Sequence, residues 1–307
     1  MNVSNVSPRE AAYADANRPW AAITANPYSG ARANRKYVEQ LAAALSERRI
    51  ETRIVWDAAE RAGLLRSPEI AGCRCIVVMG GDGTVADVIN ERPPVPLATL
   101  PLGTENLFAR EFGFTRDVHR LAEAITRGRE RTIDLGCANG RYFSLMLSAG
   151  FDAEVVRRVA AWRQAEQRLR RLTHLSYARH ILAATRAYAW PIVRLEADGE
   201  TVEGAHVIVQ NLPQYGMRLR FAPDAGADDG LLDWVVFQGS GFAATLNYAR
   251  DVRRGRHRDR ADVRCGRAQR LRLTAPEPVP LQMDGDAAGT TPVNVEIVPE
   301  ALRVIIP

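Results

Sequence analysis

The feature that most restricts the fold is a polar turn that occurs three times in the first half of the chain. Each copy follows a short apolar run and precedes a stretch of helical periodicity: 26–30, 80–84 and 101–106. Strands that alternate with helices in this way predict a doubly wound parallel sheet. In such a sheet the strand-to-helix turns gather at one edge, where ligands bind. We therefore expect the three turns to share one site.

The chain divides by pattern into two domains. The expected strands of the α/β domain are 21–25, 52–56, 76–79 and 97–100. After Thr132 short strands follow one another, separated by turns such as Asp198-Gly199 and Asp284-Gly285, which is typical of an antiparallel β-sandwich. Those strands are expected at 142–148, 192–197, 206–210, 232–237, 270–274, 293–298 and 303–306, interrupted by one helical region over 155–188. The expected organisation is a disordered lead-in (1–18), a nucleotide-binding α/β domain (19–131) and a β-sandwich domain (132–307), with a cleft between the two domains.

Lysine is nearly absent, and this excludes several classes of kinase. Of the 41 basic residues only Lys36 is a lysine, and its neighbours do not form a GxxxxGK[ST] phosphate loop or a protein-kinase V-A-I-K strand. No window of 18 uninterrupted apolar residues predicts a membrane span. The four cysteines form no CxxC pair, so we expect reduced thiols in a cytoplasmic protein: Cys73, Cys75, Cys137 and Cys265.

The arginines are concentrated in two segments. Segment 157–190 holds eight Arg against one Glu, and segment 250–272 holds ten Arg against three Asp. Two basic stretches on an otherwise acidic chain indicate a polyanionic partner, either a membrane surface or a nucleic acid. A solvated helix face is the simpler interpretation of either stretch taken alone. No basic motif interleaved with aromatic residues is present, so a nucleic acid is not favoured.

The turn Gly80-Gly81-Asp82-Gly83-Thr84 is the most specific of the three. Its glycines let the backbone approach a phosphate, and the following helix N-terminus offers free N–H groups and partial positive charge. Because Asp82 would repel a phosphate, the loop implies an intervening Mg²⁺. The sequence Asp284-Gly285-Asp286 is less specific, since Asp-Gly also favours a type I′ hairpin turn for conformational reasons alone.

These residues resemble a known family. Gly80–Thr84 (GGDGT) is the signature of diacylglycerol and sphingosine kinases and, more distantly, of NAD kinases and phosphofructokinases. The other motifs resemble the lipid-kinase branch in the same order along the chain: Asn26-Pro27 with Ser29-Gly30 (NPxSG), Pro101–Asn106 (PLGTxN), Asp134 (TIDxG), Asp229–Asp233 (DGLLD) and Asp284–Asp286 (DGE in the family). The resemblance extends from Trp20 to Pro307 and is greatest to the bacterial soluble diacylglycerol kinase-like proteins, including the YegS-type lipid kinases.

The resemblance implies an ATP- and Mg²⁺-dependent lipid kinase whose first domain is similar to that of NAD kinases and phosphofructokinases. The implied catalytic residues are Asp286 as the base, with Asp82 and Asp134, and the implied metal site uses Asp229 with the carbonyls of Gly226 and Leu231. The implied nucleotide contacts are Asn26, Gly80, Gly81, Asp82, Gly83, Thr84, Val85, Ala86, Gly103, Thr104 and Asn106. The acceptor would be a diacylglycerol-like or related lipid at the cytoplasmic face of the inner membrane, reached through the two arginine segments.

Three departures from the family pattern leave alternatives open. Asp286 replaces the family glutamate and is shorter by one C–C bond, ~1.5 Å. Glu105 stands inside the PLGTxN loop, and 211–217 is less glycine-rich than in the family. A catalytically impaired lipid- or nucleotide-binding regulatory protein is one alternative. An NAD kinase-like enzyme is another, although the DGLLD and DG(D/E) elements argue against it. The acceptor lipid and the oligomeric state stay open, with a homodimer as one option.

Overall fold

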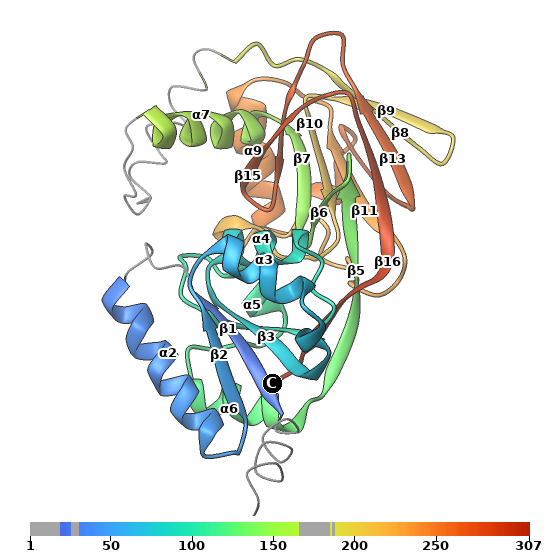
Figure 1. Ribbon diagram of the computed structural model, residues 1–307. Helices are drawn as coiled ribbons and strands as arrows, with labels where there is room; N and C mark the ends of the chain where they lie inside the picture. Colours follow the sequence, from blue (N-terminus) through green and yellow to red (C-terminus); the bar gives the residue numbers. More distant parts are fainter. Residues whose placement is uncertain (1–18, 26–30, 166–184, 186–187) are drawn as a thin grey trace, which may run out of the picture.

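The computed structural model describes residues 19–25, 31–165, 185 and 188–307. The first part of the chain forms a parallel α/β layer in the lower half of Figure 1. Its strands lie in the order β2 (Glu51–Val55), β1 (Trp20–Ala25), β3 (Cys73–Gly80) and β4 (Leu97–Pro101), and all three pairings are parallel. β1 and β4 are buried throughout and β3 nearly so, as their continuous apolar runs predict.

Five helices belong to this layer in the described part of the chain. They are α2 (Ala31–Ser46), α3 (Ala58–Arg66), α4 (Asp82–Asn90), α5 (Leu107–Glu111) and α6 (Val118–Arg127). The N-cap carboxylates of Asp57 and Asp117 start α3 and α6 by accepting backbone N–H groups, and Gly128 ends α6 at a φ of 64°. The turns that precede α4 and α5 both leave the sheet at the carboxyl ends of adjacent strands.

Two long strands join the α/β layer to the second part of the chain. β5 (Glu130–Ala138) and β16 (Val293–Ile305) pair antiparallel, and β16 also pairs with β4 at Val304. The sheet therefore continues from β4 through β16 into β13 (Arg270–Thr274), β8 (Val193–Ala197) and β9 (Glu200–Gly204), while β6 (Arg141–Phe143) pairs with β5. The last residues of β16 lie in the core of the α/β layer. The two parts thus share one sheet, which crosses the expected boundary at residue 131.

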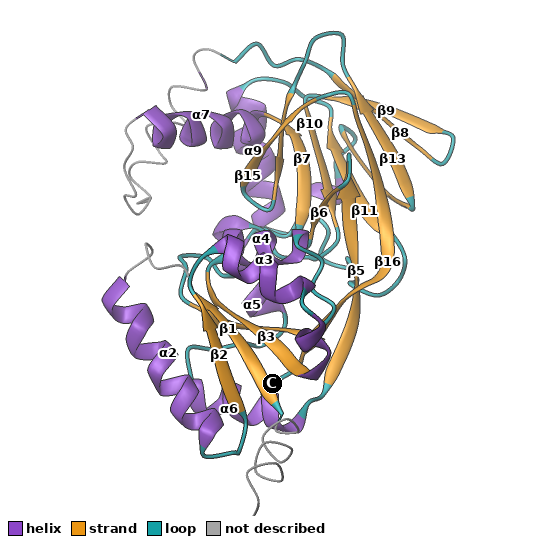
Figure 2. Cartoon of the chain, in the orientation of Figure 1, coloured by secondary structure: helices purple, strands orange, loops and turns teal. Residues whose placement is uncertain are grey.

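The second part is a two-sheet sandwich, as Figure 2 shows in its upper half. The second sheet has the order β12 (Val263–Ala268), β11 (Leu232–Phe237), β10 (His206–Gln210), β7 (Met146–Gly150), β14 (Pro280–Met283), β15 (Asp286–Thr290). Every pairing in it is antiparallel. Its inner face packs on β8, β13 and β16 in a second apolar core. The predicted fold class, a parallel α/β domain with an antiparallel sandwich, is confirmed.

Helices α7 (Phe151–Ala165) and α9 (Phe242–Arg253) lie against the second sheet. α7 contacts β7, β14 and β15, and α9 packs Tyr248 against Phe237 of β11. A chain of rings joins the two helices: Phe151 of α7 stacks on Trp190, whose ring meets His206 edge to face, and His206 in turn meets Tyr248 of α9 edge to face. Residues 166–184 and 186–187 of the predicted helix over 155–188 lie outside the described residues; Thr185 is helical and Tyr188 is not. None of the described helices is long and apolar enough to cross a bilayer.

Three predicted strands differ in the structure, in two places. The run 142–148 is divided into β6 and β7, because the amides of Ser144, Leu145 and Met146 turn toward the Asp284 carboxylate. The runs 293–298 and 303–306 form one strand, β16, with an irregularity at Glu300, whose φ is 52°. Long-range hydrogen bonds decide both cases, and a local pattern does not contain them.

Candidate active site

The turns after β3 and β4 are in direct backbone contact. A Cβ atom placed on Gly103 would lie 2.5 Å from the Gly81 Cα, and one on Gly81 would lie 3.1 Å from the Gly103 Cα. The Leu102 N–H also donates to the Gly80 carbonyl at 2.8 Å. Only glycine permits this approach at both positions. Two of the three predicted turns therefore form one surface, while Asn26 and the rest of 26–30 lie outside the described residues.

The second turn is braced by two side chains. Asn106 has a φ of 49°, and its carboxamide accepts from the Gly103 N–H and donates to the Gly103 carbonyl. The Arg116 guanidinium donates to the carbonyls of Pro101 and Gly103. Asn106 thus closes the loop from within, and Arg116 holds it from outside. Thr104 is left exposed at the tip, where its hydroxyl can contact a ligand.

The GGDGT residues form the start of α4. Gly81 is the N-cap, and residues 82–84 form the first helical turn, whose N–H groups have no partner within the helix. A Cβ on Gly80 would lie 2.5 Å from the Thr84 hydroxyl oxygen, so glycine is required for Thr84 to fold back over the strand end. Val85 and Ala86 are buried beneath this turn. The geometry is that of an anion site at a helix N-terminus.

Asp82 points to a different helix from the one that it begins. Its carboxylate accepts the Phe108 N–H at 3.0 Å and so caps the short helix α5. Burial raises the pKa of the Asp82 carboxyl above its usual value, opposed by the amides of Phe108 and Leu107, and the negative charge of Glu105 raises it further. Asp82 therefore links the two turns.

The hairpin of β14 and β15 brings Asp286 over the GGDGT turn. A Cβ on Gly83 would lie 3.9 Å from an Asp286 carboxylate oxygen, although the two residues belong to different parts of the fold. The Arg141 guanidinium lies 3.8 Å from the same carboxylate. Both side chains stay partly exposed, at 39% for Arg141 and 46% for Asp286. A carboxylate and a guanidinium therefore face the helix N-terminus from the opposite side.

Asp284 holds this hairpin in place. Its two carboxylate oxygens accept four hydrogen bonds, from the Ser144 N–H and hydroxyl and from the N–H groups of Leu145 and Met146, at 2.8–3.0 Å. The Gly285 N–H donates to the Gln282 side chain, and Asp284 and Gly285 have φ values of 49° and 89°. The turn is therefore of the type I′ kind that Asp-Gly favours, and Asp284 fixes its position on β7.

Helix α4 is fastened to the second part of the fold by Asn90. Its carboxamide accepts from the Tyr142 N–H at 2.8 Å and donates to the Tyr142 carbonyl at 3.0 Å, a paired contact with β6. One turn earlier, Asp87 faces the same side as Gly83. The pKa of Asp87 is raised by loss of solvent around its carboxyl and then by the negative charge of Asp286. The GGDGT helix is thus held to β6 by direct hydrogen bonds, and Asp286 of the hairpin lies near enough to its Asp87 to raise the pKa of that carboxyl.

Asp134 lies at the junction of the two parts, and both of its carboxylate oxygens are used there. One accepts the Gly230 N–H and the other the Glu300 N–H, each at 2.8 Å. Its own N–H donates to the Ala227 carbonyl at 2.6 Å, and its side chain is 3% exposed. These contacts hold the 226–231 loop against β5 and stabilise the irregularity in β16. Both carboxylate oxygens of Asp134 therefore take part in holding this junction.

The 226–231 loop has oxygen donors suited to a hard cation. Asp229 folds over Gly226, where an added Cβ would lie 3.2 Å from its carboxylate oxygen, and it accepts the Leu231 N–H. One carboxylate and backbone carbonyls are ligands that Mg²⁺ and Ca²⁺ prefer. The donor set therefore fits a divalent cation. Arg267 competes for it, because its guanidinium lies 3.5 Å from Asp229 and 3.2 Å from Asp233.

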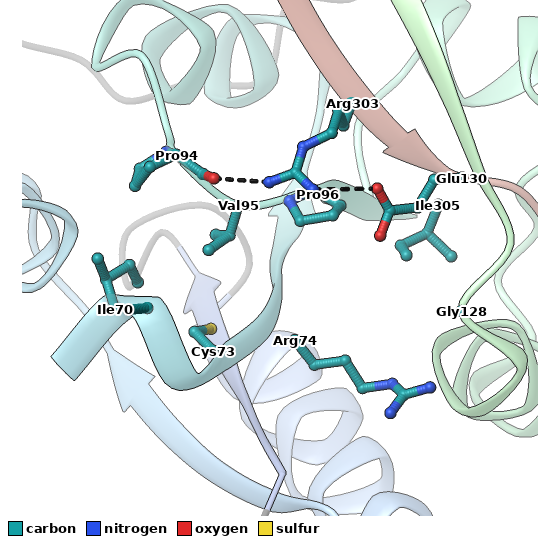
Figure 3. A pocket seen from close by; sticks show the side chains of 11 residues that line it. Ile70, Cys73, Arg74, Pro94, Val95, Pro96, Gly128, Glu130, Arg303 and Ile305 are labelled. Carbon is teal, nitrogen blue, oxygen red and sulfur yellow. Dashed lines mark hydrogen bonds and ion pairs between the residues drawn. The ribbon is translucent and has the colours of Figure 1, made fainter.

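Two open cavities of the described chain lie away from this site. One of about 590 Å³ opens near the starts of β3 and β4, at the opposite ends of the strands from the glycine turns (Figure 3). Its charged side chains are already paired: Arg303 with Glu130 and the Pro94 carbonyl, and Arg74 with the carbonyls of Ile125 and Thr126. This cavity offers no free polar group for chemistry.

Comparison with known proteins agrees with the geometry. The model of the diacylglycerol kinase catalytic domain matches residues 21–138, and that of the YegS C-terminal NAD kinase beta sandwich-like domain matches residues 145–306. A diacylglycerol kinase of Mycobacterium tuberculosis (strain H37Rv) is 30% identical over 295 residues, covering 92% of this chain and 93% of its own. The chain belongs to the diacylglycerol kinase family.

Two further relatives extend the agreement over the whole length. A diacylglycerol kinase of Bacillus subtilis (strain 168) is 26% identical over 296 residues, covering 94% of this chain and 96% of its own. A crystal structure assigned as a candidate diacylglycerol kinase of Bacillus anthracis shares the fold with a TM-score of 0.73 at 22% identity, over 100% of this chain and 99% of that one. The predicted family and enzyme class, a lipid kinase, are confirmed.

Three residues of the site were not predicted from the sequence: Asn90, Asp87 and Arg141. Asp87 carried a signal, because it lies four residues after Gly83 and so on the same face of the helix. Asn90 and Arg141 act across the two parts of the fold, where spacing along the chain gives no indication. Asp284 was predicted only as part of the Asp284–Asp286 motif, and its contacts with residues 144–146 are supplied by the structure.

Proposed function

We propose that this diacylglycerol kinase family member transfers the γ-phosphoryl group of ATP to a hydroxyl of a diacylglycerol-like lipid, with Mg²⁺. The observation that supports this most directly is the position of Asp286 over Gly83. A carboxylate at that point faces the helix N-terminus where a terminal phosphate would lie. An acceptor hydroxyl between the two has a base on one side and the phosphorus on the other.

In the proposed reaction the lipid hydroxyl gives its proton to the Asp286 carboxylate as its oxygen bonds to the γ-phosphorus. The bond from the γ-phosphorus to the bridging oxygen breaks, and ADP leaves with that electron pair. The N–H groups at the start of α4 and the Arg141 guanidinium stabilise the charge on the transferred group. Bound Mg²⁺ would supply further neutralisation of phosphate charge, with the second oxygen of Asp82 as its protein contact.

The other predicted residues take supporting roles in this proposal. Gly80, Gly81 and Gly103 keep the two turns in contact, and Thr84, Thr104 and Asn106 line or shape the nucleotide surface. Asp134 is a positioning residue, since its oxygens hold the 226–231 loop. Asp229, with the carbonyls of Gly226 and Leu231, would hold a second Mg²⁺ that stabilises this loop. We also propose peripheral contact with the cytoplasmic face of the membrane.

The test measures transfer of label from γ-labelled ATP to diacylglycerol in mixed vesicles with Mg²⁺. Asp286→Asn should lower the rate by about 100-fold or more, because removing a general base costs 10²–10⁴-fold. Asp286→Glu should retain or raise the rate. The control is Asp198→Asn, in the exposed Asp198-Gly199 turn, which has the same Asp-Gly sequence as Asp284-Gly285, and it should leave the rate unchanged.

Other results would contradict the proposal. Phosphorylation of NAD in place of lipid would assign the chain to the rival enzyme class. Activity only in Asp286→Glu would make the natural protein a binding module. If neither the unchanged protein nor any variant labels the lipid, the proposed activity on these lipids is refuted.

A further inference from the structure

Helix α9 presents large apolar side chains to solvent. Phe242 and Leu246 lie one turn apart and are 46% and 60% exposed. The opposite side of the helix is packed, since Tyr248 and Val252 are buried and the Thr245 hydroxyl is hydrogen-bonded to the His206 ring at 3.0 Å. The helix is thus fixed to the sheet by one face. Its outer face exposes two large apolar residues side by side. Single exposed apolar residues are normal, but adjacent ones indicate a surface that binds a partner.

The same outer face continues into a group of arginines. Arg250 and Arg253 follow Leu246 at helical spacing, and Arg254 and Arg256 come directly after. Within the described part of the chain, Arg253, Arg254 and Arg256 are exposed and their side chains make no hydrogen bond or ion pair. Residues 250–260 hold six arginines against two aspartates, a net charge of 6 − 2 = +4. This charge is available to a partner.

The described arginines of the other basic segment are not available in the same way. Arg157 and Arg158 of α7 both bind the Glu154 carboxylate, at 2.7 Å and 2.6 Å. Although burial of Glu154 favours the neutral carboxyl, these two guanidinium groups hold its pKa below the usual value. Among the arginines of the two segments whose side chains are described, Arg253, Arg254 and Arg256 thus form a group without carboxylate partners at the end of α9.

We propose that α9 docks the protein on an anionic bilayer. Phe242 and Leu246 enter the boundary between headgroups and acyl chains, and Arg253, Arg254 and Arg256 contact the lipid phosphates. Large apolar residues beside exposed arginines are the composition of an interfacial helix, and the negative surface adds charge complementarity. A nucleic acid would attract the arginines but offers no apolar layer for the two exposed side chains. This inference rests on the proposed lipid kinase function and names the surface through which the enzyme reaches its substrate.

The position of α9 agrees with that role. α9 and α7 are linked through the ring contacts of Tyr248, His206, Trp190 and Phe151. α7 in turn packs on β14 and β15, the hairpin that carries Asp286. Figure 1 shows α7, α9 and β15 together in the same region of the second part. A bilayer held at α9 would lie beside the layer that carries the proposed base.

Vesicle co-sedimentation tests the proposal, with phosphatidylcholine alone or with about one third phosphatidylglycerol. An arginine at an anionic surface is worth about fivefold in binding, so Arg253→Gln with Arg256→Gln should weaken binding to the anionic vesicles about 25-fold. Phe242→Ser with Leu246→Ser should weaken it roughly tenfold or more. The matched controls are Arg270→Gln with Arg272→Gln, from the same segment but on β13 of the other sheet, and Ile54→Ser, an exposed apolar residue of β2. Both controls should bind as the unchanged protein does.

Three results would overturn the proposal: equal binding to neutral and anionic vesicles, unchanged binding in both α9 variants, or the same loss in the β13 control. Thermal melting of each variant shows whether the fold is retained. Activity on a short-chain, water-soluble diacylglycerol separates this inference from the proposed function. The α9 variants should keep that activity, whereas its absence in the unchanged protein would refute the kinase proposal and leave the vesicle result to stand alone.

Discussion

The Asp284 carboxylate offers a direct test of how the site is assembled. Four donors converge on its two oxygens, and all four belong to residues 144–146. In Asp284→Asn the side chain keeps only one oxygen. Its new NH₂ group is a donor and cannot accept the hydrogen bonds of the donors that it faces. At least two hydrogen bonds to a charged acceptor are then lost, each worth about 1.5 kcal/mol at the lower end of the usual range. We expect a loss of about 3 kcal/mol in the free energy of unfolding.

The chain contains a matched control for this change. The turn at Asp198-Gly199 has φ values of 48° and 86°, against 49° and 89° at Asp284-Gly285. Asp198 is exposed and makes no side-chain hydrogen bond within the described part of the chain. Asparagine is favoured in such turns as much as aspartate, so both substitutions keep the backbone. Asp198→Asn should change the stability by less than about 0.5 kcal/mol.

Urea unfolding and lipid phosphorylation are measured on both variants. Because Asp286 follows two residues later, a shift of the turn by about 1 Å would lower the rate by about 100-fold. Equal stability of the two variants would refute the energetic role of the four hydrogen bonds. Lower stability with an unchanged rate would refute the claim that Asp284 positions Asp286.

Three other changes have defined outcomes. Gly103→Ala places a Cβ 2.5 Å from the Gly81 backbone. It should weaken ATP binding, measured by calorimetry, tenfold or more, which is about 1.4 kcal/mol. Gly63→Ala is the control, because a Cβ there meets nothing within 4 Å, and it should leave ATP binding unchanged. Burial lowers the pKa of His206 from 6.5 to about 4. Between these two pKa values the His206 ring is protonated in the unfolded chain but not in the folded one. The free energy of unfolding therefore falls as the pH falls from 6.5 toward 4, by about 2 kcal/mol between about pH 7.5 and 5. His206→Gln should remove that part of the pH dependence in urea unfolding, and an unchanged profile would contradict the assignment. Mg²⁺ at ten times its Kd should stabilise the protein by about 1.4 kcal/mol in thermal melts, and Asp229→Asn should abolish the effect. No effect in the unchanged protein would indicate that Arg267 already fills that role.

The sequence predicts the turns of the site well because their determinants are local. An apolar run, glycines and a helix start lie within about a dozen residues at 76–89, and the structure places Gly80 to Thr84 at the end of β3 and the start of α4 as expected. The same holds for the turn at 101–106. The meeting of these two turns follows from the rule that parallel strands end at one edge. Their backbone contact at Gly81 and Gly103 is the detail that only the structure supplies.

The sequence predicts long-range roles poorly because identical local patterns serve different purposes. Asp198-Gly199 and Asp284-Gly285 read alike and adopt the same turn, yet only Asp284 binds a distant segment. The resemblance implies a catalytic role for Asp134, but its contacts with Gly230 and Glu300 depend on residues that lie far away in sequence. Such contacts change where strands begin and end, as the division of 142–148 shows.

The predicted aspartates can be ordered by the use of their oxygens. Asp134 and Asp284 give both oxygens to backbone N–H or hydroxyl donors, and Asp82 gives at least one. Asp286 accepts no hydrogen bond within the described chain, and its ion pair with Arg141 is loose, at 3.8 Å. A carboxylate that takes a proton from a substrate needs a free oxygen, whereas one that holds a loop needs its oxygens occupied. We therefore expect Asp134 and Asp284 to act through stability and positioning, and Asp286 to act on the rate directly, a division that the family signature alone does not make.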